Sequence, residues 1–283
     1  MKNFIIRTIT AVFFVAAIVT CFLNPRAMVF LFALVTGMTI WEFTGLVNEH
    51  QPSTTVNRMI STVAGVYFFL AMAGYNSGLT PATVFIPYLV SIIYLMIAEL
   101  YLKQENPIND WAYTMFSQMY IALPFSLLNV LAFRSTGIDI QYIYLVPLSV
   151  FVFLWINDTG AYICGSLLGK HKLFPRISPG KSWEGSIGGG LLVMAVAVLV
   201  WYLTEKYDVN DIQLNAFEWA GLGLVIVIFG TWGDLTESLF KRTLGIKDSG
   251  HILPGHGGML DRFDSSLMAI PAAVVYLYTL TLF

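Results

Sequence analysis

The chain has 283 residues, of which 57% are hydrophobic and 11% are charged, and its formal net charge is −2. This composition, with its strongly positive mean hydropathy, excludes a water-soluble globular domain and indicates an integral membrane protein. Its two cysteines, Cys21 and Cys164, lie in or at the ends of apolar runs, so we expect two free thiols and no disulfide framework.

Nine apolar runs have the length of a membrane-crossing helix. A hydrocarbon core requires about 20 apolar residues per helix, and these runs are continuous rather than alternating, which favours helices over barrel strands. The runs lie at residues 4–22, 28–47, 59–79, 82–102, 111–132, 141–163, 186–204, 216–233 and 264–282. The sequence therefore predicts an all-α, polytopic membrane protein with about nine transmembrane helices.

The Lys and Arg residues predict the orientation of these helices. With the N-terminus in the cytosol, only Arg26, Arg134 and Lys206 fall outside, which leaves twelve of the fifteen basic residues on the cytosolic side. Residues 1–135 are predicted to be a scaffold of helices, and residues 136–283 to carry the polar loops and catalytic groups of the same continuous membrane domain. Glu42 and Glu99 are interpreted as interfacial groups or helix partners outside the site.

The sixth predicted helix ends in polar residues, and a polar loop follows it. Asn157 and Asp158 lie at the inner end of the helix, where polar groups face the bundle or a cavity more often than lipid. Lys181 and Ser182 come just before the seventh helix, and helix N-termini attract anions, so both are candidate phosphate or nucleotide contacts. The three other basic residues of the loop are interpreted as a solvated surface: Lys170, Lys172 and Arg176.

Acidic side chains recur at helical spacings in the last third of the chain. If the eighth helix continues beyond residue 233, four polar side chains share one face of it: Asp234, Glu237, Ser238 and Lys241. Asp261 and Asp264, three positions apart, repeat the arrangement. Carboxylates gathered in this way bind Mg²⁺, and the predicted metal ligands are Asp234, Asp261 and Asp264. In the alternative interpretation, these acids only form ion pairs with Arg242, Arg262 and Lys247.

The segment from Ser238 to Asp264 places seven charged side chains between two apolar runs: Lys241, Arg242, Lys247, Asp248, Asp261, Arg262 and Asp264. Because a charge at the bilayer centre costs about 2.5–3.5 kcal/mol on insertion scales, these groups must line water or a substrate. The glycine run ending in Gly257 and Gly258 predicts either a phosphate cradle or a tight turn, and the neighbouring basic residues favour phosphate. His256 either contacts phosphate, shuttles a proton or hydrogen-bonds the turn.

This segment resembles the C-terminal signature of the phosphatidate cytidylyltransferases, also called CDP-diacylglycerol synthases. The signature runs Ser, any, apolar, Lys-Arg, four free positions, Lys-Asp, a spacer, His-Gly-Gly, apolar, any, Asp-Arg, apolar, Asp, and it is matched from Ser238 to Asp264. Other stretches also look like family features, namely Gly233-Asp234-Leu235, Asn157-Asp158-Thr159 and the loop from Ser178 to Gly185. Ser182 stands where threonine is expected, and Gly180 where a polar or basic residue is frequent.

The resemblance implies transfer of a cytidylyl group from CTP to phosphatidic acid, which gives CDP-diacylglycerol and pyrophosphate in phospholipid biosynthesis. It implies Mg²⁺ at the predicted metal ligands, with a second metal ion or K⁺ nearby, and a homodimer in a bacterial-type inner membrane. We expect membrane lipid as a partner and no nucleic acid. The implied catalytic residues are Asp234, Lys241, Arg242, Lys247, Asp248, His256 and Arg262. The implied substrate-binding residues are Asn157, Asp158, Ser178, Lys181, Ser182, Glu184, Glu237, Ser238, Gly257 and Gly258.

Three other functions are weighed against this one. A CDP-alcohol phosphotransferase has a motif that opens with Asp-Gly and ends in aspartates separated by three residues, whereas Asp261 and Asp264 have two residues between them. A CTP-dependent lipid kinase is not expected to carry the whole signature. A secondary transporter should show two related halves with paired broken helices, but here the charges gather at one end of the chain.

Overall fold

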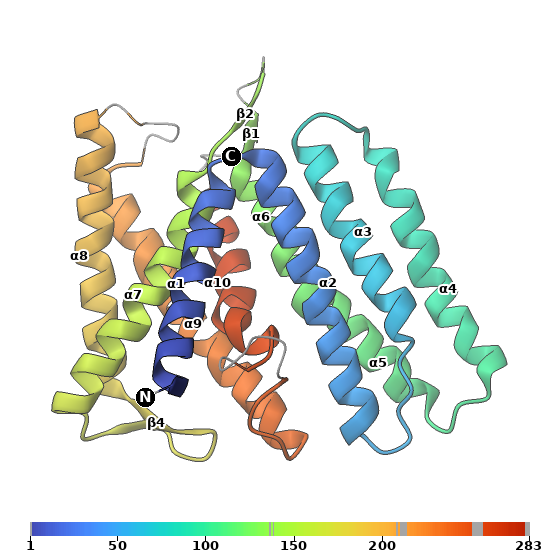
Figure 1. The fold of residues 1–283 in the computed structure, drawn as a ribbon. Helices are drawn as coiled ribbons and strands as arrows, with labels where there is room; N and C mark the ends of the chain where they lie inside the picture. Colours follow the sequence, from blue (N-terminus) through green and yellow to red (C-terminus); the bar gives the residue numbers. More distant parts are fainter. Residues whose placement is uncertain are drawn as a thin grey trace. The chain divides into compact units, whose positions relative to one another are not determined.

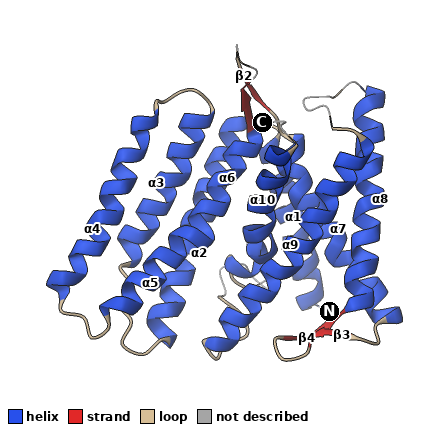
Figure 2. Cartoon of the chain, turned by 180° about the vertical axis from the view of Figure 1, so that it is seen from behind, coloured by secondary structure: helices blue, strands red, loops and turns tan. Residues whose placement is uncertain are grey.

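The structure of the protein is a computed structural model that describes residues 2–135, 137, 139–207, 209, 214–250 and 257–280. Helices make up most of these residues (Figures 1 and 2), and the chain divides into two compact units. Unit 1 comprises Met1–Tyr144 and Lys241–Phe263, and unit 2 comprises Leu145–Phe240 and Asp264–Phe283. Most of the charged segment therefore groups with the N-terminal helices.

Unit 1 is built mainly from helices, and polar side chains cap the N-termini of several of them. Asn24 accepts hydrogen bonds from the N–H groups of Arg26 and Ala27 at the start of the second helix, and Asn57 caps the third in the same way. The elements of the unit are α1 (Lys2–Phe22), α2 (Pro25–His50), α3 (Arg58–Asn76), η1 (Ala82–Phe85), α4 (Ile86–Leu102), α5 (Pro107–Ser117), η2 (Gln118–Ala122), α6 (Leu123–Ala132), β1 (Phe133–Ser135) and β2 (Ile140–Tyr142).

Unit 2 contains α7 (Leu145–Leu168), β3 (Lys172–Phe174), β4 (Ser178–Ser182), α8 (Trp183–Tyr207), most of α9 (Ala216–Thr243) and most of α10 (Leu260–Thr279). Glycines let α7 and α8 approach closely: a Cβ on Gly160 would lie 3.0 Å from the Cα of Gly189. This packing holds the C-terminal half of α7 beside the N-terminal part of α8.

Seven of the described helical segments are long and apolar enough to cross a membrane: Pro25–His50, Arg58–Asn76, Ala82–Leu102, Pro107–Ala132, Leu145–Leu168, Trp183–Tyr207 and Ala216–Thr243. The other two predicted spans fall on α1 and α10, which are helical as well. The prediction of a polytopic helical membrane protein is therefore confirmed, and the count of nine crossings stays a prediction.

Two short antiparallel hairpins were not predicted. β1 pairs with β2, and β3 pairs with β4, where Lys172 lies opposite Ser182 and Phe174 opposite Ser178. The polar loop after α7 is thus an ordered hairpin that leads directly into α8. As a consequence, Lys181 is held on a strand only two residues before the helix begins.

Phe263 anchors the start of α10 in the core of unit 1. Its fully buried ring lies 5.6 Å from the ring of Phe14, 6.1 Å from that of Phe32 and 5.4 Å from that of Phe125, between ring centroids. Aromatic contacts at these distances add to the free energy of burial. The first turn of α10 is therefore fixed against α1, α2 and α6.

Candidate active site

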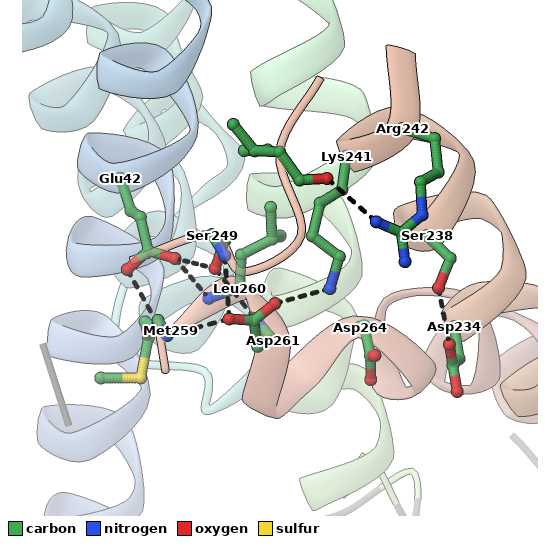
Figure 3. A network of polar contacts seen from close by, with 12 residues as sticks. Glu42, Asp234, Ser238, Lys241, Arg242, Ser249, Met259, Leu260, Asp261 and Asp264 are labelled. Atoms are coloured by element: carbon green, nitrogen blue, oxygen red, sulfur yellow. Dashed lines mark hydrogen bonds and ion pairs between the residues drawn. The ribbon is translucent and has the colours of Figure 1, made fainter. Parts of the chain in front are cut away.

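In unit 1, the charged segment is organised around Asp261 (Figure 3). The Nζ atom of Lys241 lies 2.7 Å from Asp261 Oδ1, and the side chains are only 14% and 8% exposed, respectively. The other carboxylate oxygen, Oδ2, accepts hydrogen bonds of 3.0 Å from the backbone N–H groups of Ser249 and Gly258. Both oxygens of Asp261 are therefore held in place by the protein.

These contacts decide the charge state of Asp261. Burial of the carboxyl group favours its neutral form, but the hydrogen bonds from Lys241, Gly258 and Ser249 outweigh burial and hold the pKa of Asp261 below its ordinary value. The side chain is consequently a carboxylate at neutral pH, as a metal ligand or an acceptor must be.

Glu42 of α2, interpreted from the sequence as an interfacial group or a helix partner, binds the same loop at the start of α10. The carboxylate is 6% exposed. Its Oε1 accepts hydrogen bonds from the Ser249 hydroxyl at 2.5 Å and the Leu260 N–H at 3.0 Å, and its Oε2 accepts one from the Met259 N–H at 2.8 Å. The sequence signal that could have found it is a lone acid within an apolar span, since such acids are often functional. Glu99 is likewise buried, and no hydrogen bond or ion pair joins it to the described residues of this loop.

Gly257 and Gly258 have local structural reasons to be glycine. Gly257 has a φ of +82°, a conformation that other residues rarely adopt, and a Cβ on Gly258 would collide with Glu42 Oε1 and Ser249 Oγ. Both glycines thus permit the turn that presents backbone N–H groups to two carboxylates. His256 and the rest of residues 251–256 lie outside the described residues.

Four other charged residues of the segment, Arg242, Lys247, Asp248 and Arg262, are exposed. Arg242 donates a hydrogen bond of 3.4 Å to the carbonyl oxygen of Ile246, just beyond the end of α9. Lys247 and Asp248 follow in the loop, and Arg262 is exposed in the first turn of α10. None of these three basic residues has a recorded ion pair with the predicted metal ligands in the described part of the chain.

In unit 2, the hairpin after α7 meets α9. Lys181 Nζ lies 2.5 Å from Asp234 Oδ2, and the Ser238 hydroxyl donates a hydrogen bond of 3.1 Å to Asp234 Oδ1. The condition for the shared helix face is met, because α9 runs unbroken to Thr243. The structure therefore brings together two regions that are about fifty residues apart in the sequence.

Asp264 adds a further negative charge to this cluster. Asp234 and Asp158 both repel its carboxylate, whereas Lys181 attracts it. Asp264 Oδ1 accepts a 2.5 Å hydrogen bond from the Ser265 N–H. Three acidic side chains thus gather around one lysine.

A polar cavity of about 180 Å³ lies beside this cluster, lined by residues that include Asn157, Asp158, Lys181 and Ser182. Asn157 is 6% exposed, and its Oδ1 has no hydrogen-bond partner among the described residues. The Ser182 hydroxyl oxygen accepts a hydrogen bond from the Gly185 N–H at 3.2 Å, as a cap at the start of α8 does. The cavity therefore offers a cation and an unsatisfied buried acceptor.

Three other predicted substrate-binding residues stand in different settings. Glu184 accepts hydrogen bonds from the backbone N–H of the exposed His171 and contacts its ring at 2.6 Å, so it closes the hairpin. Ser178 pairs with Phe174 within the hairpin. Glu237 is fully buried on α9.

The donor chemistry of the acids suits Mg²⁺, which prefers carboxylate oxygens. In unit 2 a bound cation would favour the charged forms of Asp158, Asp234 and Asp264. Within the described residues, however, no group of three or more His, Cys, Asp or Glu side chains is arranged to hold a metal ion. Instead, lysines provide the positive charge beside two of these acids: Lys181 pairs with Asp234, and Lys241 pairs with Asp261.

The fold and these clusters define a class of protein: a polytopic helical membrane protein with paired carboxylates and lysines suited to phosphate chemistry. The family model of the cytidylyltransferase family matches residues 5–280. The chain is 32% identical over 268 residues to a phosphatidate cytidylyltransferase of Staphylococcus aureus (strain COL), covering 94% of this chain and 96% of the relative.

Two further relatives carry the same name. The one from Staphylococcus haemolyticus is 34% identical over 271 residues, with 94% and 96% coverage, and the one from Haemophilus influenzae is 32% identical over 279 residues, with 94% and 95% coverage. The chain therefore belongs to the cytidylyltransferase family, which makes it a nucleotidyltransferase and confirms the resemblance inferred from its motifs.

Proposed function

We propose that this membrane protein is a phosphatidate cytidylyltransferase. The observation that carries the proposal is the match of its family and of relatives with that name over nearly the whole chain. In the reaction, a phosphate oxygen of phosphatidic acid attacks the α-phosphorus of CTP. The bond from that phosphorus to the oxygen bridging to the β-phosphate breaks, and pyrophosphate leaves with the electron pair.

The chain's own residues would act mainly by positioning and by neutralising charge, as is usual in phosphoryl-group chemistry. Lys181, just before the N-terminus of α8 in unit 2, places a positive charge beside a phosphate oxygen, and Lys241 does the same in unit 1. We propose Asp234 and Asp264 of unit 2 and Asp261 of unit 1 as Mg²⁺ ligands. Bound Mg²⁺ would supply further neutralisation of phosphoryl charge.

Two adjoining cavities in unit 2 support an amphipathic substrate. The polar cavity beside Lys181 shares two lining residues, Ser186 and Thr231, with an apolar groove of about 350 Å³ between α8 and α9. The groove follows α8 from Trp183 to Met194, a length of about 16 Å at 1.5 Å per residue. A lipid phosphate fits this pairing, with its headgroup at Lys181 and an acyl chain in the groove.

A larger side chain in the groove should lower activity with long-chain lipids more than with short-chain lipids. Leu191 lines the groove and Leu199 does not, although both lie on α8 and are 59% and 51% exposed. Leu191→Trp is expected to lower kcat/KM for long-chain phosphatidic acid about tenfold and to spare a short-chain analogue, because a methylene contact contributes about 1 kcal/mol. Leu199→Trp is the matched control, and equal effects of the two substitutions would remove the groove from the lipid site.

The activity is tested with the purified protein in detergent, supplied with phosphatidic acid, labelled CTP and Mg²⁺. CDP-diacylglycerol and pyrophosphate are the expected products, and a chelator should stop their formation. Release of CDP would indicate a lipid kinase instead. CMP released from CDP-diacylglycerol and an alcohol would indicate a CDP-alcohol phosphotransferase, and a wild-type protein that forms neither CDP-diacylglycerol nor pyrophosphate would refute the proposal.

We also propose that the catalytic groups face the cytosol, where CTP is available. The supporting observation is the excess of Lys and Arg in the segments predicted to be cytosolic. A homodimer, implied by the family resemblance, is proposed on that ground alone.

A further inference from the structure

We propose that Glu42 is a positioning residue for the reaction, which fixes the carboxylate of Asp261 through Ser249 and the first turn of α10. This inference rests on the proposed function and goes beyond it, because Glu42 lies on α2, about two hundred residues before the charged segment, and outside every motif of the sequence. All of the residues involved belong to unit 1.

The first step is the binding of Glu42 to the loop. Its carboxylate receives three hydrogen bonds, two of them from the consecutive N–H groups of Met259 and Leu260 at the start of α10. The first N–H groups of a helix have no partner within the helix, and a negative charge there is favoured by the helix dipole. Glu42 therefore caps the N-terminus of α10, although it lies on a different helix, α2.

The second step leads from Glu42 to Asp261. Ser249, which is 2% exposed, donates its hydroxyl hydrogen to Glu42 Oε1 and its backbone N–H to Asp261 Oδ2. The Asp261 N–H in turn lies 3.4 Å from Ser249 Oγ. One residue thus joins the two carboxylates, and Figure 3 shows the three side chains in a continuous chain of contacts.

The third step is the space that the loop leaves for Glu42. A Cβ on Gly250 would lie 2.8 Å from Glu42 Oε2, and one on Gly258 would collide with Glu42 Oε1. Two glycines on either side of the undescribed part of the loop therefore stand at the points where Glu42 approaches the backbone. The described residues on both sides of this gap thus leave room for the Glu42 carboxylate.

Glu42→Gln tests the proposal. It keeps the size of the side chain but sets an NH₂ group against a donor, so that at least one hydrogen bond is lost. We expect kcat to fall about 10- to 100-fold, the range found when partners that orient a functional group are removed, while the KM for CTP changes little. Glu99→Gln is the matched control, because Glu99 is a buried acid of the same unit at 8% exposure, and it should retain wild-type kcat.

Hydrogen exchange provides a readout that does not depend on activity. The backbone N–H groups of Ser249, Gly258, Met259 and Leu260 should exchange faster in Glu42→Gln than in the wild type, and Glu99→Gln should leave them unchanged. Ser249→Ala should also lower kcat, and the double variant with Glu42→Gln should lose less than the product of the two single losses, since both act on Asp261.

Three results would overturn the inference: wild-type kcat in Glu42→Gln, unchanged exchange at these four amides, or independent effects in the double variant. If Glu42→Gln does not fold, Ser249→Ala decides alone, and wild-type kcat with unchanged exchange in that variant counts against the proposal. A wild-type protein without cytidylyltransferase activity would refute the proposed function, while the exchange measurement would still decide whether Glu42 fixes the loop.

Discussion

Asp261→Asn is expected to reduce turnover by about 10³-fold or more while the protein remains folded. Asparagine keeps one oxygen that can accept the N–H groups of Ser249 and Gly258, but it loses the charge that pairs with Lys241 at 2.7 Å. Without that charge, the side chain is a poor ligand for Mg²⁺, and the ion pair with Lys241 is lost. The measurement is kcat with long-chain phosphatidic acid in detergent, together with the melting temperature.

Asp110→Asn is the control for this prediction. Asp110 is also a buried acid of unit 1, 1% exposed, and it accepts a 2.6 Å hydrogen bond from the Thr55 N–H, but it belongs to no predicted site. Its replacement should lower the melting temperature and leave kcat of the folded protein near the wild-type value. Normal turnover in Asp261→Asn would remove this residue from the catalytic groups.

Much of the fold could be predicted because a membrane helix is indicated by one continuous apolar run of the sequence. In the described residues, most of each apolar run is helical, and the spacing of Asp234 and Ser238 correctly indicated one helix face. The hairpin that holds Lys181 was missed because its strands are only three and five residues long and alternate too briefly to give a pattern. Short polar strands such as these depend on their surroundings more than on their own sequence.

The partners of the site residues could not be predicted with the same success. The sequence identified basic groups near the acids, yet the recorded ion pairs use Lys241 and Lys181 rather than Arg242, Arg262 or Lys247. Lys181 precedes Asp234 by 53 positions in the sequence, a separation at which no helical or strand period applies. Such pairs follow from tertiary packing, which single-sequence patterns do not encode.

The glycine run illustrates the same limit. Its residues were interpreted as a phosphate cradle favoured by nearby cations, with a tight turn as the alternative. The structure gives Gly257 a positive φ and crowds Gly258 against Glu42, so a turn explains both of them. The binding of phosphate by this loop stays a prediction, and its central residues lie outside the described part of the chain.

Asp264→Asn is expected to have two effects of opposite sign. Turnover should be abolished, because a proposed Mg²⁺ ligand is lost. Without divalent cation, however, the variant should be more stable than the wild type, because burial and repulsion from Asp234 and Asp158 both disfavour the carboxylate that it removes. Asparagine can keep the 2.5 Å hydrogen bond from the Ser265 N–H through its own oxygen. Each kcal/mol gained should raise the melting temperature by about 2–4 °C.

Adding Mg²⁺ should then separate the two proteins. A ligand that binds only the folded state stabilises it, so the melting temperature of the wild type should rise with Mg²⁺ concentration, and that of Asp264→Asn should rise much less. A variant that turns over normally would exclude Asp264 as a ligand. A variant that melts below the wild type in chelator would show that the repulsion from Asp234 and Asp158 is weaker than the contacts of the carboxylate. The acidic cluster of unit 2 would then be an ion network centred on Lys181 rather than a cation site that is strained when empty.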